Sequence, residues 1–176
     1  MTTSSRRGFI GSLALAGAAS GAALAGAGRA GAAPAALPFS AFKKDTDFAC
    51  VYHCDFGDQA RFGQMLGNIS NHLSVYDFDP MRLKIVVVAH GPGLKFFLED
   101  VSGTPWASQT VDPDLYTRFA GLAKYGVEGY LCQITFKRLS IDVAKARSDP
   151  FLKLVPSGVA SVAELQSHGF SYLKIA

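Results

Sequence analysis

Cysteine is scarce in this sequence, and its small number excludes a disulfide scaffold. The 176 residues include three cysteines, Cys50, Cys54 and Cys132. An odd number leaves at least one thiol free or paired outside the chain. The C-x-x-C spacing of many thiol-disulfide oxidoreductases is also absent. A redox enzyme is therefore the least favoured of the functional classes considered.

Excess positive charge is also lacking once the first residues are set aside. The whole chain has 17 Lys and Arg residues against 14 Asp and Glu residues. Arg6, Arg7 and Arg29 are the only charged residues before position 34, so 14 basic and 14 acidic residues remain after it. A chain with a formal net charge of zero offers no basic surface for nucleic acid or an anionic membrane. Neither partner is predicted.

The apolar run near the start of the chain is too weak for a good membrane span. Residues 9–28 are mostly Ala, Gly and Ser with a few Leu, whereas a span needs about 20 strongly apolar residues. A pair of arginines, Arg6 and Arg7, precedes Phe9. A charged start, an apolar middle and a small-residue end are the layout of a secretory signal. Paired arginines favour the twin-arginine class.

We therefore predict that residues 1–33 are a twin-arginine signal peptide and that the protein is periplasmic or otherwise exported. Small residues permit cleavage after Ala33 or Ala36. No stable membrane span is expected after cleavage. The alternative is a permanent N-terminal anchor, which the many glycines of the run disfavour.

The part of the chain after the signal is long enough for one domain with a single core. Residues 34–46 are predicted to form a flexible leader. Residues 47–176 alternate between strand-like and helix-like patterns. Such alternation favours a parallel sheet with helices on both faces. We predict an α/β domain of three α/β/α layers with a mostly parallel five-stranded sheet.

The predicted elements follow from apolar periodicity and from turn residues. Strands are predicted over residues 48–54, 83–89, 127–131, 151–155 and 170–175. Helices are predicted over residues 58–74, 94–101, 115–125, 133–139 and 162–167. Asp58 and Ser161 are the predicted N-caps of the first and last of these helices.

Three reactive side chains fall at predicted strand ends, where open parallel sheets bind their ligands. Cys54 ends the first strand, His90 follows the second, and Cys132 follows the third. A thiol at a helix start meets unpaired N–H groups that favour the thiolate, which makes Cys132 the candidate catalytic residue. A buried cysteine that acts as a small apolar group is an equally weighted interpretation.

A glycine-rich turn follows the second predicted strand. Gly91 and Gly93 allow backbone N–H groups to approach an anion, and Lys95 lies in the predicted first helical turn. His90, these glycines, Lys95 and Cys54 are the predicted ligand-binding residues, with Cys54 as a resolving thiol. The alternative is a plain turn with a hydrogen-bonded histidine, because the spacing fits no P-loop or dinucleotide motif.

A metal site made of Cys50, His53 and Cys54 is disfavoured by strand geometry. The four residues from Cys50 to Cys54 span about 13 Å in a strand, and His53 points to the opposite face. No metal and no cofactor are predicted.

Four stretches of the sequence resemble the DsrE/DsrF-like family of sulfur-relay proteins. Together they cover residues 47–175 in order. They are NISNHL at 68–73, KIVVVAHGPGL at 84–94, YGVEGYLCQITFK at 125–137, and VPSGV at 155–159 followed by Leu165, Gln166 and Tyr172.

This resemblance implies an α/β fold and homo-oligomers, trimers or hexamers. For some members it implies a cysteine that carries sulfur as a persulfide, and the matching position is Cys132, with His90 lining the site. We expect an exported sulfur carrier or thiol-active protein that takes sulfane sulfur from a donor protein or a small sulfur species. Whether it is a sulfurtransferase or only a carrier stays open. The alternative is a non-catalytic oligomeric binding module for a small anion or metabolite.

Overall fold

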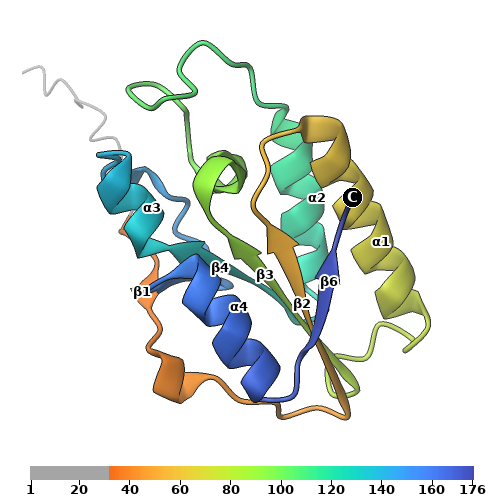
Figure 1. Ribbon diagram of the computed structural model, residues 1–176. Coiled ribbons are helices and arrows are strands. Elements are labelled where there is room, and N and C mark those ends of the chain that lie inside the picture. Colours follow the sequence, from red (N-terminus) through yellow and green to blue (C-terminus); the bar gives the residue numbers. More distant parts are fainter. Residues whose placement is uncertain (1–31) are drawn as a thin grey trace, which may run out of the picture.

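Six parallel strands form one sheet within residues 32–176, the part of the chain that the computed structural model describes (Figure 1). The predicted signal peptide lies outside the described residues, except for Ala32 and Ala33. The strand order is β1-β5-β4-β3-β2-β6, and every pair is parallel. The strands are β1 (Ala35–Ala36), β2 (Phe48–Cys54), β3 (Leu83–Ala89), β4 (Val127–Cys132), β5 (Leu152–Val155) and β6 (Ser171–Lys174).

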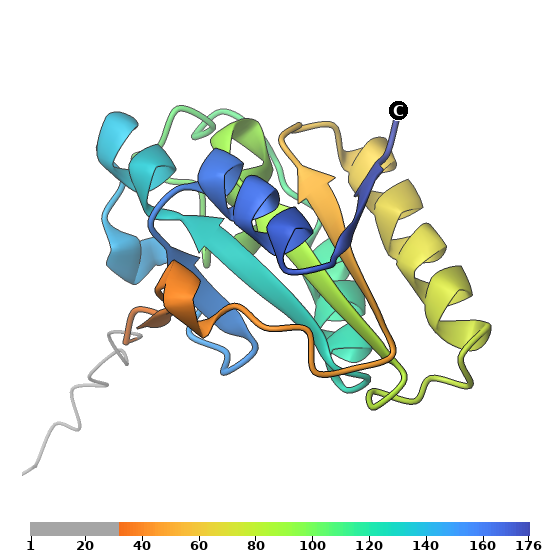
Figure 2. The ribbon, with the colours of Figure 1, turned by 60° about the horizontal axis from the view of Figure 1, so that its bottom comes forward.

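Helices cover both faces of the sheet, as Figures 1 and 2 show. The α-helices are α1 (Gln59–Ser74), α2 (Pro113–Ala123), α3 (Gln133–Arg138) and α4 (Gly158–Ser167), and the 3₁₀ helices are η1 (Phe39–Ala41), η2 (Gly91–Phe97) and η3 (Val143–Lys145). Helices α1 and α2 lie on one face, and α4 lies on the other. The predicted three-layer α/β fold is confirmed, with six strands in place of five. No helix of residues 32–176 has the length and hydrophobicity to cross a bilayer.

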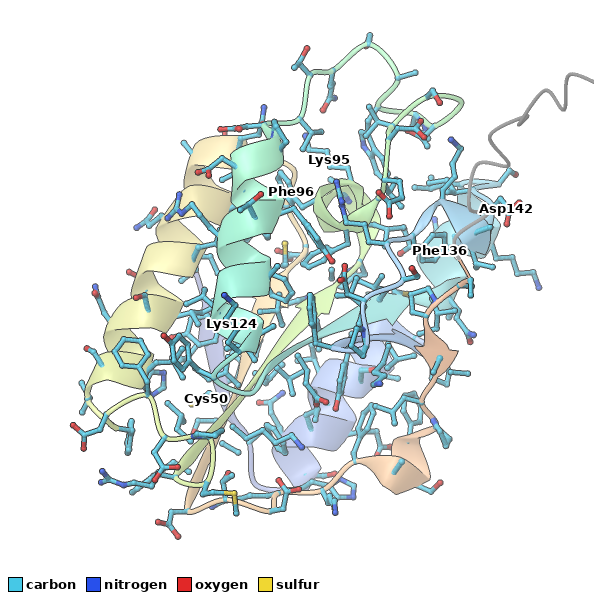
Figure 3. The ribbon with its side chains drawn as sticks, turned by 180° about the vertical axis from the view of Figure 1, so that it is seen from behind. Cys50, Lys95, Phe96, Lys124, Phe136 and Asp142 are labelled. Atoms are coloured by element: carbon cyan, nitrogen blue, oxygen red, sulfur yellow. The ribbon has the colours of Figure 1, made fainter. Side chains whose placement is uncertain are left out.

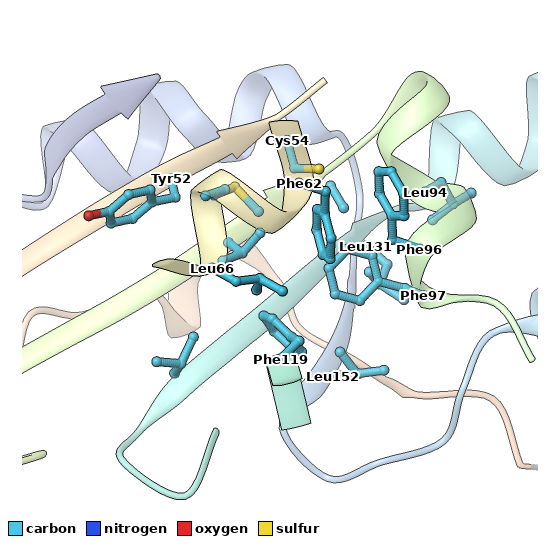
Figure 4. Packing of buried hydrophobic residues seen from close by; sticks show 14 of the residues in the cluster. Tyr52, Cys54, Phe62, Leu66, Leu94, Phe96, Phe97, Phe119, Leu131 and Leu152 are labelled. Atoms are coloured by element: carbon cyan, nitrogen blue, oxygen red, sulfur yellow. The ribbon is translucent and has the colours of Figure 1, made fainter. Parts of the chain in front are cut away.

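Two apolar clusters, one on each face, hold the layers together. The larger cluster lies between the sheet and helices α1 and α2, where the ring of Phe62 stacks on Phe96 at 4.1 Å between centroids (Figure 4). The smaller cluster lies under α4. Alternate residues of β3 enter the two clusters: Val87 belongs to the larger, and Val86 and Val88 to the smaller. The continuous apolar run of this strand thus reflects burial on both faces.

The first helix cap is as predicted, and the last is not. The side chain of Asp58 accepts a hydrogen bond from the backbone N–H of Arg61 at 2.7 Å and caps α1. Helix α4 begins at Gly158, because Ser157 and not Ser161 is its N-cap. Ser161 is therefore inside the helix and fully buried, and its hydroxyl has no hydrogen-bond partner among residues 32–176.

The helix predicted over residues 94–101 is wrong. The chain forms the 3₁₀ helix η2 instead, and Leu98 then pairs in a β-bridge with Ala146. Phe96, Phe97 and Leu98 are consecutive and all buried. An α-helix on the surface would turn one of three such neighbours toward solvent.

The flexible leader predicted for residues 34–46 is also wrong. Ala35 and Ala36 pair with β5, and the N–H of Leu37 donates to the carbonyl of Leu154 at 2.8 Å. Phe42 is 3% exposed and stacks on Tyr130 at 5.4 Å between ring centroids. Strand β5 would otherwise be an open edge with unpaired backbone groups, so this segment completes the sheet.

We expect β1 to contribute measurably to stability. A chain of residues 37–176 lacks the backbone hydrogen bonds of β1 and should lose about 1–2 kcal/mol in its free energy of unfolding relative to residues 34–176. Urea denaturation of both chains measures the difference. A chain of residues 32–176 is the control, and its free energy of unfolding should equal that of residues 34–176. Equal stability of the chains starting at 34 and 37 would show that β1 is dispensable.

Candidate functional site

The register of the three central strands brings their carboxyl ends together. Ala89 of β3 pairs with Cys54 of β2 and with Leu131 of β4. His90 is the next residue after β3, and Cys132 is the next residue of β4. The N–H of His90 donates to the carbonyl of Cys54 at 3.1 Å, which extends the ladder by one step. His90 and Cys132 are thus neighbours across adjacent strands, about 5 Å apart.

Both side chains belong to the face covered by α4. Side chains alternate along a strand, and Tyr130 packs on the α4 face whereas Leu131 packs on the opposite face. Cys132 therefore returns to the α4 face. The contact of His90 with α4 is direct, because a Cβ added at Gly158 would lie 2.7 Å from His90 Cβ. The structure thus places Cys132 and His90 at neighbouring strand positions on the same face of the sheet.

Cys132 is only 4% exposed. It is the N-cap residue of α3, and its side chain makes no cap hydrogen bond. Helix α3 begins at Gln133 as predicted, but it has only six residues. Because the thiol is nearly covered in a single chain, only a small reagent can reach it without movement of its surroundings.

His53 and Tyr172 join this site, although the sequence did not indicate them. His53 Nε2 lies 2.6 Å from His90 Nε2, and His53 Nδ1 lies 2.9 Å from the hydroxyl of Tyr172 in β6. Beside them Lys174 Nζ donates to Asp55 Oδ2 at 3.1 Å. The three side chains form a continuous hydrogen-bonded row, Tyr172–His53–His90, at the carboxyl end of the sheet. In the described part of the chain, no three His, Cys, Asp or Glu side chains are arranged as a metal site.

Burial favours the neutral form of both histidines. Burial is the main cause that lowers the pKa of both His53 and His90 below their usual 6.5, and Lys174 lowers both further. The negative charge of Asp55 opposes these effects in both cases. Two neutral imidazoles 2.6 Å apart must divide their roles, one donating and the other accepting the hydrogen bond.

The remaining predicted residues lie around the opposite face. Cys54 is completely buried in the larger cluster (Figure 4), and burial strongly raises the pKa of its thiol. A Cβ at Gly93 would lie 2.8 Å from Cys54 Sγ, so the glycine is needed for this close packing. Lys95 is also buried and donates to Gln109 Oε1 at 2.6 Å, below the loop before α2 (Figure 3). These residues do not meet Cys132.

The prediction that Cys54 resolves a bond to Cys132 is therefore wrong. Strand β3 lies between their strands, which separates the two Cα atoms by about 10 Å. A disulfide requires Cα atoms within about 7 Å. The two thiols also point to opposite faces of the sheet.

A small hollow lies beside the glycine-rich turn. It measures about 240 Å³ and is lined by Gly91, Thr135, Arg138 and Leu139. The N–H of Gly91 donates to Thr135 Oγ1 at 3.0 Å, and Gly91 has a φ of 52°, which favours glycine. Arg138, and not the predicted Lys95, is the cation here. A larger hollow of about 550 Å³ lies at the opposite, amino end of β3 and β4.

Comparison with known proteins identifies the family. A sequence model of the DsrE/DsrF-like family matches residues 48–175. This chain belongs to the DsrE/DsrF-like family. No curated protein matches it.

A solved structure supports the same fold. The protein MTH1491 from Methanobacterium thermoautotrophicum, described as a protein of unknown function, has a TM-score of 0.56 and 20% sequence identity to this chain. The match covers 73% of this chain and 99% of that one. At this identity the likeness concerns the fold alone. The resemblance found in the sequence to the DsrE/DsrF-like family is confirmed.

We expect Gly158→Ala to disturb the site. The added methyl group would press on the rigid part of the His90 side chain and should cost about 1–3 kcal/mol in the free energy of unfolding. Gly121→Ala in α2 is the matched control, because a Cβ there meets nothing within 4 Å; it should stabilise the protein by about 0.5–1 kcal/mol. Urea denaturation measures both, and a stabilising effect of Gly158→Ala would contradict the contact.

The histidine pair should also make stability depend on pH. Because the pKa of each histidine is lower in the folded state than its usual 6.5, the unfolded chain binds more protons as the pH falls. The free energy of unfolding should therefore decrease as the pH is lowered through 6.5. A His53→Gln, His90→Gln double variant should show a shallower decrease in urea denaturation across this range.

Some slope should remain in that double variant, since burial also lowers the pKa of His72. If the double variant and the wild type lose stability equally as the pH falls, the two histidines are not held neutral by the fold.

Proposed function

We propose that this protein is an exported sulfur carrier that takes up sulfane sulfur on Cys132 as a persulfide. The observation that carries this proposal is that Cys132 and His90 follow paired residues of β4 and β3 and lie on the same face of the sheet, at the carboxyl ends of these strands. Membership of the DsrE/DsrF-like family supports a sulfur-relay role, and the twin-arginine pattern at residues 1–33 supports export.

The chemistry requires a thiolate and a place for its proton. A neutral imidazole beside a thiol accepts that proton. The thiolate of Cys132 then attacks the outer sulfur of a polysulfide. A Cys–S–S bond forms, the S–S bond of the polysulfide breaks, and the shortened polysulfide anion leaves. Transfer of the outer sulfur to an acceptor thiolate returns Cys132 to its starting state.

The burial of Cys132 favours a small donor over a protein thiol. A linear polysulfide needs less movement of the site than a folded partner does to reach a thiol that is 4% exposed. Trimers or hexamers form part of the proposal. Exposed Val159 of α4 and exposed Leu173 of the edge strand β6 supply apolar surface for another copy.

A second function, the binding of a small anion without transfer, is favoured by the hollow beside Gly91. Arg138 supplies a positive charge there, and the nearly covered Cys132 would then be structural. In this case sulfate or phosphate should raise the thermal midpoint of the wild type and not that of Arg138→Gln, and Cys132→Ser should respond as the wild type does.

We expect the purified protein to gain the mass of one sulfur atom when it is treated with polysulfide, because Cys132 is the thiol beside an imidazole. Intact mass spectrometry and peptide mapping should place the sulfur on Cys132, and Cys132→Ser should gain none. Cys50→Ser is the matched control and should load as the wild type does, since burial raises the pKa of the Cys50 thiol. Loading of Cys132→Ser, or none in the wild type, would refute the carrier function.

A further inference from the structure

The row Tyr172–His53–His90 extends well beyond what a single proton acceptor requires. It joins the edge strand β6, strand β2 and the residue that follows β3, and it runs from the strand neighbour of Cys132 to the protein surface. We propose that this row is a proton relay that conducts the thiol proton of Cys132 to solvent. The inference rests on the proposed function only in that Cys132 is the reacting thiol.

One nitrogen of His90 has no hydrogen-bond partner among residues 32–176 and is therefore open to a new partner. His90 Nε2 is committed to His53 Nε2 at 2.6 Å, and His90 Nδ1 makes no hydrogen bond to another of the residues 32–176. His53 is engaged at both nitrogens, with His90 on one side and the Tyr172 hydroxyl on the other. Tyr172 is 38% exposed, so the far end of the row meets water.

The proton transfers balance along this row. At the start, His90 Nε2–H donates to His53 Nε2, and His53 Nδ1–H donates to the oxygen of Tyr172. The S–H bond of Cys132 breaks as its proton moves to His90 Nδ1. The proton on His90 Nε2 moves to His53 Nε2, and the proton on His53 Nδ1 leaves through Tyr172 to water. Both imidazoles end neutral, Cys132 ends as the thiolate, and one proton enters solvent.

The charges around the pair favour passage of the proton over its retention. Asp55, after β2, stabilises a protonated imidazole, whereas Lys174 of β6 opposes it. The amino end of α4, in contact with His90 at Gly158, also opposes a positive charge. The buried residues of α4 carry no ionisable group. A proton that reaches His90 is thus not held there by a dominant negative charge.

The chain provides a matched control on the other face of the sheet. The hydroxyl of Tyr52 lies 3.2 Å from His72 Nδ1, so this pair has the same chemistry as His53 and Tyr172. Tyr52 belongs to the larger cluster under α1, away from the α4 face. Changes in this pair should not affect the proton of Cys132.

The test is the rate at which iodoacetamide alkylates Cys132 across a pH series, measured by mass spectrometry of the full chain. His53→Gln should lower the rate near neutral pH by about tenfold. Removal of a direct general base usually lowers a rate by about 10²–10⁴-fold, and the loss is smaller here because His90 remains. It should also change the pH profile. Tyr172→Phe, at an exposed position, should lower the rate by about threefold without a change in fold. His72→Gln should match the wild type at every pH.

Wild-type rates and profiles in both His53→Gln and Tyr172→Phe would overturn the relay. Circular dichroism of each variant checks that its fold is retained, and Tyr172→Phe keeps the test decisive if His53→Gln does not fold. Alkylation uses no sulfur donor. A protein that shows the predicted alkylation pattern but takes up no sulfur would refute the carrier function and leave the relay in place.

Discussion

The parallel register of β2, β3 and β4 is the constraint on which the site depends. Each ladder fixes which residue of one strand lies beside which residue of the next, and the pairing of Ala89 with Leu131 sets His90 beside Cys132. A shift of one residue would turn one of these side chains to the other face. The register is secured by valines of β3 that are buried on both faces, because exposure of this run to solvent would be costly.

The sheet also separates the reactive groups into two environments. On the α1 and α2 face, Cys54 is sealed among aromatic rings. On the α4 face, His53 and His90 remain partly open and keep a hydrogen-bonded connection to the surface through Tyr172. Two thiols at the ends of nearby strands therefore have different surroundings: Cys54 lies among aromatic rings, and Cys132 lies on the face that carries the histidine pair.

Much of the fold could be predicted from apolar patterns, and the errors have physical causes. The run at 83–89 could only be a buried strand, and Asp58 before an amphipathic pattern indicated a cap. Ser157 and Ser161 are both acceptable caps, and the sequence does not say which one lies at the turn. Strand β1 has two alanines and no alternation, so its pairing follows only from the open edge of β5.

For the site, Cys132 and His90 could be chosen because both follow predicted strands. The contact of His53 with Tyr172 could not be predicted, because it joins residues 119 positions apart and requires the strand order.

NMR titration of the histidine ring nitrogens shows whether Cys132 and His90 are neighbours that exchange a proton. Cys132→Ser should change the chemical shifts and the titration midpoint of His90, while those of His72 stay as in the wild type. Identical titration of His90 in the wild type and in Cys132→Ser would contradict it.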